Sequence, residues 1–286
     1  MTLGQASLPM TDGLLTSAQV AHLLGVTPAT VKRWADAGLI PCARTVGAHR
    51  RFRPEEVARF ARARGAVEED PAETWADRLL EEREPMGLQV LLLQERAHLG
   101  SWWRVAETLA GAARAIGERW AGGTVGVLEE HAASERLARA VARVVESLPP
   151  REGAPRVLLA SAEGDEHTLG LALSEVVFRE WGWATRWAGR AAPAPDLASA
   201  LLRHEADVLA LSATAVSPAT TLASELGALA PAARAAGGAL VLGGAGPWPE
   251  PRAPDARVRD FASLRAFLAA EDARRAIPHL SPEGLS

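Results

Sequence analysis

Hydrophobic and polar positions follow three different patterns along this 286-residue chain. In the first 65 residues, short apolar groups are separated by turn signals, which predicts small helices and a hairpin. From about residue 72 to residue 148, apolar residues recur every three or four positions, which predicts amphipathic helices. Beyond Pro155, short apolar runs alternate with amphipathic stretches. This last pattern predicts strands and helices in alternation. We therefore expect a multidomain α and α/β protein.

The first region, residues 1–65, reads as a winged helix-turn-helix domain. Thr16 and Ser17 can cap a helix that runs to Leu24, and a second helix is expected from Thr27–Pro28 to about Ala37. Residues 42–52 suit a two-stranded wing, and Pro54 begins a further helix. Residues 66–72 are acidic and contain a proline, so we interpret them as a linker.

The rest of the chain divides near Pro149–Pro150. Breaks at Pro85, Gly100 and Gly122–Gly123 predict a four-helix bundle over residues 73–150. Residues 151–286 are expected to form a doubly wound, Rossmann-like parallel sheet, whose ligands lie beyond the carboxyl ends of the strands. The expected strands are residues 156–160, 183–187, 208–213, 239–242 and 258–259. Residues 273–286 are expected to be a loose tail.

Charge is distributed unevenly between these regions. The whole chain has a net charge of −4, but residues 1–65 contain nine Lys or Arg and four Asp or Glu, a balance of +5 that leaves −9 for the remainder. A basic head on an acidic body indicates that the head binds a polyanion such as double-stranded DNA. The single cysteine, Cys42, excludes an internal disulfide and a C-x-x-C site. With no apolar run of about 20 residues and no signal peptide, we expect a cytoplasmic protein without a membrane partner.

Three short polar pieces follow three of the predicted strands. They are Asp165-Glu166-His167-Thr168-Leu169-Gly170, then Ser212-Ala213-Thr214, then Gly243-Gly244. A histidine in a turn after a buried strand can offer one ring nitrogen to a metal while a carboxylate holds the other. Hydroxyls at 212 and 214 and glycines at 170, 243 and 244 would line a slot for a bulky ligand.

These pieces resemble, in order and spacing, the D-x-H-x-x-G, S-x-L, G-G signature of the vitamin B12 (cobalamin) domain, with Thr214 in place of leucine. The resemblance implies that His167 is the lower cobalt ligand and that Asp165 orients it. The expected cofactor is cobalamin, with adenosylcobalamin favoured over methylcobalamin or hydroxocobalamin.

The head resembles MerR-type and excisionase-type DNA-binding domains over residues 15–64. Ala48-His49-Arg50-Arg51-Phe52 matches the family element G-H-R-x-Y/F except at Ala48. The second helix is expected to present its exposed face to a major groove, and the wing to carry cations to phosphates. The residues predicted to bind DNA are Thr27, Thr30, Lys32, Arg33, His49, Arg50, Arg51 and Arg53.

A third resemblance concerns the predicted bundle. Trp120, followed nine residues later by Glu130-His131, resembles the W-x9-E-H element of cobalamin-dependent photoreceptor regulators of the CarH and LitR kind. It implies that these three residues contact the upper ligand of cobalt. The residue after the tryptophan is a cobalt-capturing histidine in well-studied members, whereas here it is Ala121, which cannot coordinate a metal.

The expected function is therefore a cobalamin-binding, light-responsive repressor that binds DNA as a homodimer or homotetramer and is not an enzyme. Two alternatives remain open on the sequence. One is a light-independent cobalamin-sensing regulator, which Ala121 favours. The other is a corrinoid methyl-carrier protein of a methyltransferase system, against which the basic head argues.

Overall fold

The computed structural model describes residues 14–45, 47–64 and 70–276. The chain forms two compact units, Met1–Glu81 and Glu82–Ser286. Each unit has its own packed interior, and each is described separately below. Among the described residues, no helix combines the length and the apolar character that crossing a lipid bilayer requires.

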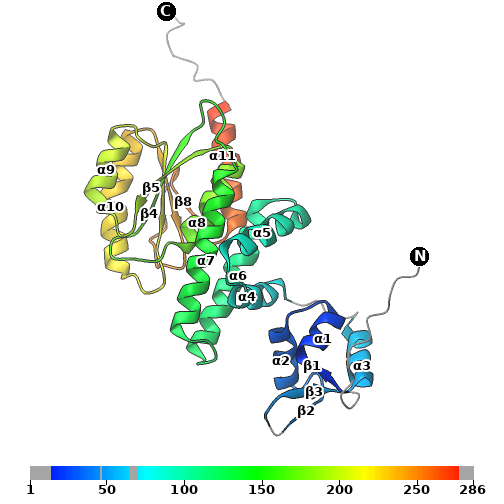
Figure 1. Ribbon diagram of the computed structural model, residues 1–286. Helices are drawn as coiled ribbons and strands as arrows, with labels where there is room; N and C mark the ends of the chain where they lie inside the picture. Colours follow the sequence, from blue (N-terminus) through cyan, green and yellow to red (C-terminus); the bar gives the residue numbers. More distant parts are fainter. Residues whose placement is uncertain (1–13, 46, 65–69, 277–286) are drawn as a thin grey trace, which may run out of the picture. The chain divides into compact units, whose positions relative to one another are not determined.

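The first unit contains a three-stranded antiparallel sheet in the order β1-β3-β2 and four helices (Figure 1). Its elements are β1 (Leu15–Thr16), α1 (Ser17–Leu24), α2 (Pro28–Asp36), β2 (Cys42–Arg44), β3 (Arg50–Phe52), α3 (Pro54–Arg64) and α4 (Pro71–Glu81). The helix starts form as expected: Thr16 makes a capping box with Gln19, and the Thr27 hydroxyl accepts the Thr30 backbone N–H. The short strand β1 was not predicted, because only two residues pair with β3.

The head is built around Val20, Val31, Ile40 and Phe52, all of which have no exposed surface. Phe52 stands in β3, opposite Leu15 of β1 and Cys42 of β2, so the wing is anchored in the core. The winged helix-turn-helix prediction is confirmed. The predicted linker is wrong at one end, since residues 71–72 already belong to α4; the linker residues 65–69 lie outside the described residues.

The second unit begins with three long helices, α5 (Pro85–Leu99), α6 (Trp102–Ala121) and α7 (Val127–Glu146). Their contacting faces carry small and medium apolar residues, such as Ala106, Leu109 and Leu137, which are almost fully buried. The prediction of four helices over residues 73–150 agrees with α4–α7, but α4 is grouped with the first compact unit rather than with α5–α7.

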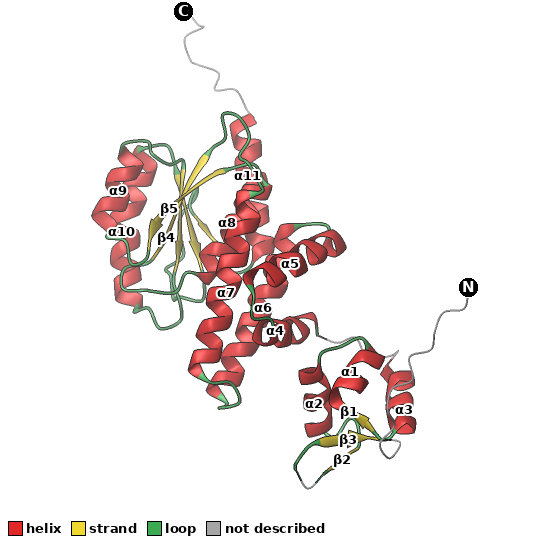
Figure 2. Cartoon of the chain, viewed as in Figure 1, coloured by secondary structure: helices red, strands yellow, loops and turns green. Residues whose placement is uncertain are grey.

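A five-stranded parallel sheet forms the rest of the second unit, in the order β5-β4-β6-β7-β8. Helices α9 and α10 cover one face, and α8 and α11 cover the other, with α6 and α7 packed outside α8 (Figure 2). The elements are β4 (Arg156–Ser161), α8 (Leu169–Glu180), β5 (Ala184–Gly189), α9 (Ala194–Leu202), β6 (Val208–Ser212), α10 (Ala219–Ala235), β7 (Ala239–Gly243), β8 (Ala256–Arg257) and α11 (Phe261–Ala276).

The strand order reverses between β4 and β6, because β5 lies on one side of β4 and β6 on the other. Such a switch point opens a crevice at the carboxyl ends of the two strands, where ligands bind in doubly wound sheets. The fold class predicted from the alternating pattern is confirmed. Two details were wrong: the last strand is residues 256–257, not 258–259, and residues 273–276 of the predicted tail belong to α11, which packs against α6 and α8. The rest of the predicted tail, residues 277–286, lies outside the described residues.

Candidate functional site

Asp165 is the centre of the site. It lies in the turn after β4 and is 4% exposed. One carboxylate oxygen accepts the backbone N–H and ring Nδ1 of His167, each at 2.9 Å. The other accepts the Thr214 N–H (2.6 Å), the Thr214 hydroxyl (2.7 Å) and the Ser217 hydroxyl (2.7 Å). Burial disfavours the charged carboxylate, but these hydrogen bonds outweigh it and hold the pKa of Asp165 far below its usual range.

This carboxylate fixes the histidine in a metal-binding form. With Asp165 accepting from Nδ1, the proton of neutral His167 is on that nitrogen, and Nε2 is left with its lone pair. The His167 side chain is 68% exposed, whereas the Asp165 side chain is 1% exposed. The Nδ1 side of the imidazole is therefore held by a buried carboxylate, while the rest of the ring is accessible to a ligand. Metal-binding histidines are commonly oriented by a carboxylate in this way.

The three predicted pieces meet at one end of the sheet. Ser161, Ser212 and Gly243 are neighbours in register at the ends of β4, β6 and β7. A Cβ on Gly170, near the start of α8, would lie 3.7 Å from the Ser212 hydroxyl. Sequence pieces that are 28 to 41 residues apart thus meet at the carboxyl ends of β4, β6 and β7, beside the switch point.

The need for glycine at 244 lies within the protein itself. Gly244 has a φ of +79°, and a Cβ there would collide with the backbone carbonyl oxygen of Ala213. Gly246 is constrained by space alone, because a Cβ there would lie 2.6 Å from that of Ala213. This loop therefore runs directly against Ala213, just after the end of β6, an approach that a side chain at 244 would block.

Three residues of the site were missed from the sequence. The Ser217 hydroxyl completes the bonds to Asp165, and the Ser161 hydroxyl bridges the turn by donating to the Asp165 carbonyl and accepting the Ala191 N–H. Arg257 donates to the carbonyls of Gly244 and Gly246 and so holds the glycine loop. Serine and arginine are common in loops, so no motif distinguished these three.

Two predicted site residues have a looser environment. Glu166 is exposed, and its carboxylate lies 3.9 Å from the Arg190 guanidinium. Thr168 is the N-cap residue of α8, but its side chain makes no capping hydrogen bond. Their assignment to the cofactor site stays a prediction.

Helices α6 and α7 extend past the start of α8. The Trp102 N–H, at the start of α6, donates to both carboxylate oxygens of Glu180 at the end of α8 (3.0 and 2.8 Å). From this shared end, α6 rises by about 27 Å to Trp120, whereas α8 rises by about 17 Å back to Leu169, at 1.5 Å per residue. Measured from this shared end, α6 is about 10 Å longer than α8. Its Trp120 end therefore reaches beyond the start of α8, the helix that directly follows His167 and Thr168 in the chain.

The overhang carries the residues predicted to cap the cofactor. Trp120 is 52% exposed, and Leu128, at the start of α7, is 81% exposed. The His131 ring binds the Val127 carbonyl through Nδ1 at 2.7 Å, and Glu130 accepts the Ser134 hydroxyl at 2.9 Å. Exposed apolar side chains of this size are a feature of surfaces that bind a partner or a ligand. The assignment of Trp120, Glu130 and His131 to the cofactor stays a prediction.

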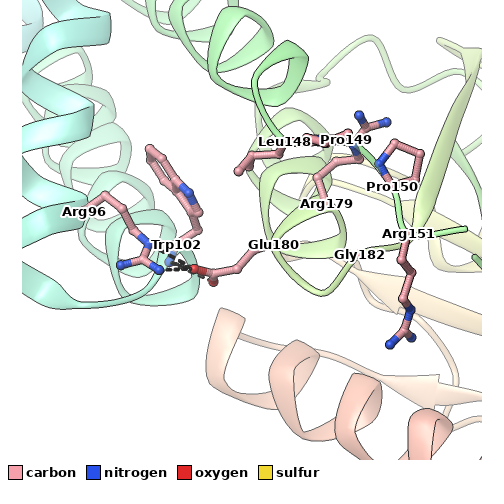
Figure 3. A pocket seen from close by; sticks show the side chains of 9 residues that line it. All are labelled: Arg96, Trp102, Leu148, Pro149, Pro150, Arg151, Arg179, Glu180 and Gly182. Carbon is pink, nitrogen blue, oxygen red and sulfur yellow. Dashed lines mark hydrogen bonds and ion pairs between the residues drawn. The ribbon is translucent and has the colours of Figure 1, made fainter.

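At the opposite end of α8, a shallow pocket marks where the bundle is fastened to the α/β domain (Figure 3). Arg96 of α5 forms an ion pair with Glu180 at 2.8 Å, and Glu180 also receives the Trp102 N–H described above. The Arg179 guanidinium donates to the Leu148 carbonyl, at the end of α7, at 2.6 Å. These contacts fix how far α5, α6 and α7 are shifted along their axes relative to α8. The pocket lies at the end of α8 opposite to His167, so it is remote from the candidate site.

In the head, the predicted DNA-binding residues fall into two groups. Lys32, His49 and Arg53 are exposed. The prediction that Thr30 lies on an exposed face is wrong: it is 1% exposed, because its hydroxyl donates to Asp77 of α4 at 2.7 Å. Arg33 is half-buried and paired with Glu73 of α4 at 2.9 Å.

The wing arginines also differ among themselves. Arg50 binds both carboxylate oxygens of Asp36, at 2.5 and 2.7 Å, and the Arg50 side chain is only 18% exposed. This hydrogen bond from Arg50 lowers the pKa of Asp36 and joins the wing to the end of α2. Arg51 is half-buried and donates to the Arg50 carbonyl, and Thr27 uses its hydroxyl to cap α2. Arg50 therefore holds the wing against the end of α2, a structural role that is separate from its predicted contact with DNA phosphates.

Two family matches agree with this architecture. Residues 14–65 match the helix-turn-helix domain family, and residues 155–265 match the B12 binding domain family. The second match spans β4 to β8 and contains every residue of the crevice described above. Residues 155–265 are therefore a B12-binding domain, and its presence supports cobalamin or corrinoid binding.

Individual relatives cover different parts of the chain. The HTH-type transcriptional repressor CarH of Myxococcus xanthus is 31% identical over 100 residues, which cover 35% of this chain and 33% of that protein. A monomethylamine corrinoid protein of Methanosarcina barkeri has the same fold over 69% of this chain and 95% of its own, with a TM-score of 0.52 and 16% identity. A cobalamin-binding protein of Desulfitobacterium hafniense DCB-2 gives a TM-score of 0.35, at 16% identity over 72% of this chain and 97% of its own.

Proposed function

We propose that this chain, which joins a helix-turn-helix domain to a B12-binding domain in the manner of CarH-type B12-dependent transcription regulators, is a repressor that binds DNA and responds to light through cobalamin. The observation that carries the proposal is the Asp165–His167 pair, which presents an oriented imidazole nitrogen at the switch-point crevice. The basic head supplies the second half of the proposal, because its exposed cations suit a polyanion.

The residues of the crevice fit a corrinoid. His167 would provide the lower ligand to cobalt, with Asp165 as its hydrogen-bond partner. The hydroxyls of Ser212 and Thr214 and the close-lying glycine loop would line the slot for the cofactor's nucleotide tail. A bound alkylcobalamin supplies a cobalt–carbon bond that visible light can break.

The overhanging ends of α6 and α7 would cover the upper side of the cofactor. Trp120 offers a stiff apolar face to a nucleoside, and the Glu130 carboxylate can accept hydrogen bonds from ribose hydroxyls. Packing of these side chains would differ with the upper ligand, and that difference could change the affinity of the chain for a second copy or for DNA.

A second candidate function is a light-independent cobalamin sensor. It is favoured by Ala121, whose methyl side chain cannot bind cobalt from above at the position next to Trp120. In that case the cap would report whether cobalamin is bound, and illumination would not alter the assembly or the DNA affinity.

The test is to add adenosylcobalamin to the apo protein in darkness. The visible spectrum, the mass by size-exclusion chromatography and the affinity for genomic DNA fragments are then measured before and after green light. His167→Ala is the matched variant, and His204→Ala, an exposed histidine at the end of α9, is the control.

We expect binding in the dark, a changed spectrum after light, and changes in both mass and DNA affinity, with binding weakened only in His167→Ala. An altered spectrum with unchanged mass and DNA affinity would select the light-independent sensor. Equal cobalamin binding by the parent protein and His167→Ala would contradict the assignment of the cobalt ligand.

A further inference from the structure

Helix α4 packs against the second helix of the helix-turn-helix, α2, within the first compact unit. Three of its acidic residues, Glu73, Asp77 and Glu81, are spaced at i, i+4 and i+8 and therefore occupy one face of the helix. They contact α2 in reverse order: Glu81 accepts the Ala29 N–H at 3.1 Å, Asp77 accepts the Thr30 hydroxyl at 2.7 Å, and Glu73 accepts from Arg33 at 2.9 Å.

The central contact is buried. Asp77 is 3% exposed, and its carboxylate binds both Thr30 and the Arg33 guanidinium, the latter at 3.3 Å. Charged hydrogen bonds that are shielded from water are stronger than those of a solvated pair. The flanking contact of Glu73 is weaker, because both its side chain and that of Arg33 are more than a third exposed.

The α2 groups held by α4 are those that a phosphate backbone would use. An amide N–H in the first turn of a helix, a hydroxyl and a guanidinium are the usual phosphate donors in helix-turn-helix proteins. Here each of them is matched by a carboxylate of the same chain. A row of carboxylates in this position is chemically a substitute for the phosphates of DNA.

We propose that α4 is an autoinhibitory segment that occupies α2 and must leave it before α2 can enter a major groove. The proposal rests on the proposed DNA-binding function of the head. It also gives that function a route of control, since only Glu82, Arg83 and Glu84 separate α4 from α5, the first helix of the cobalamin-binding unit. A movement of α5 would therefore be passed to α4, and so to its contact with α2, through only three residues.

The experiment measures the affinity of the full-length protein for a random-sequence 30-bp DNA duplex at low salt. The test variant is E73Q/D77N/E81Q, which keeps the shapes and removes three negative charges. The matched control is E135Q/E146Q/E152Q, which removes three charges from exposed positions after α6. A milder variant, E73Q/E81Q, leaves buried Asp77 intact and serves if the triple variant folds poorly.

Autoinhibition predicts that the test variant binds on the order of tenfold more tightly than the parent. The control variant should show only the small increase in DNA affinity that any loss of negative charge produces. The affinity of E73Q/E81Q should lie between those of the control and the test variant. Equal affinities for the test and control variants would overturn autoinhibition while leaving DNA binding intact. Absence of binding by the parent and all variants would overturn the DNA-binding function as well, so the two failures can be told apart.

Discussion

Glu225 should make the stability of the B12-binding domain depend on pH. This α10 carboxylate is 3% exposed. One of its oxygens accepts a long hydrogen bond of 3.4 Å from the Glu163 N–H, and the other has no hydrogen-bond partner in the described part of the chain. Burial, helped by the nearby charge of Glu163, raises the pKa of Glu225 from 4.5 to about 7.

The direction of the effect follows from proton binding. Below pH 4.5 the carboxyl group is protonated in both the folded and the unfolded chain, so it does not oppose folding. Between pH 4.5 and about 7 the unfolded chain loses this proton while the folded chain keeps it, so the free energy of unfolding falls as pH rises. The raised pKa corresponds to a total loss of about 3 kcal/mol, which is complete above about pH 7.

Glu225→Gln removes the titrating group and keeps its shape. We expect the parent and the variant to have similar free energies of unfolding at pH 4.5, and the variant to be more stable by about 3 kcal/mol at pH 8. Urea unfolding followed by tryptophan fluorescence at several pH values measures the difference, because every other titrating group is shared. Glu163→Gln is the control, since it removes the neighbouring charge and should recover only a small part of the gain. A constant offset between the two curves at all pH values would refute the reasoning.

Three further predictions concern the site and the wing. Asp165→Asn should lower the free energy of unfolding by about 2–4 kcal/mol, because an amide NH₂ must face one set of donors; it should also weaken cobalamin binding in a spectral titration, since the amide can turn His167 to the tautomer with a proton on Nε2. Gly244→Ala should destabilise the domain by at least about 1–3 kcal/mol in thermal unfolding through the strained φ and the collision with Ala213, and a stability equal to that of the parent would contradict the geometry. Asp36→Asn should loosen the wing arginines and raise amide hydrogen exchange in β2 and β3, with no change expected in the B12-binding domain.

Much of the fold followed from the sequence because its signals are local. Helix caps at Thr16 and Thr27, glycine at the helix end and apolar runs in the sheet each act within a few residues. The first four predicted strands agree with the structure to within about two residues. The two-residue strand β1 was not predicted and β8 was placed two residues too late, since both owe their position to a partner strand rather than to their own pattern.

The candidate site was predictable where a motif fixes both residue type and spacing. The hydrogen bond between Asp165 and His167 forms as expected, whereas the Thr214 hydroxyl, predicted to line the ligand slot, donates to Asp165. The sequence could not show that Ser217 joins the same carboxylate, or that Thr30 faces α4 instead of solvent. Both depend on tertiary contacts between segments 47 to 52 residues apart. Helical periodicity marks which residues share a face, but it does not identify what covers that face.

The ion pair between Arg96 and Glu180 and the hydrogen bond from the Trp102 N–H attach the start of α6 to one end of α8. The helix α6 can therefore tilt about this end. Trp120 is about 27 Å along α6 from that point, so a tilt of about 5° there would displace the indole by about 2 Å. A displacement of about 2 Å is comparable to the size of one methyl group. Because this attachment lies at one end of α6, a small change of angle at Glu180 would become a much larger displacement at Trp120.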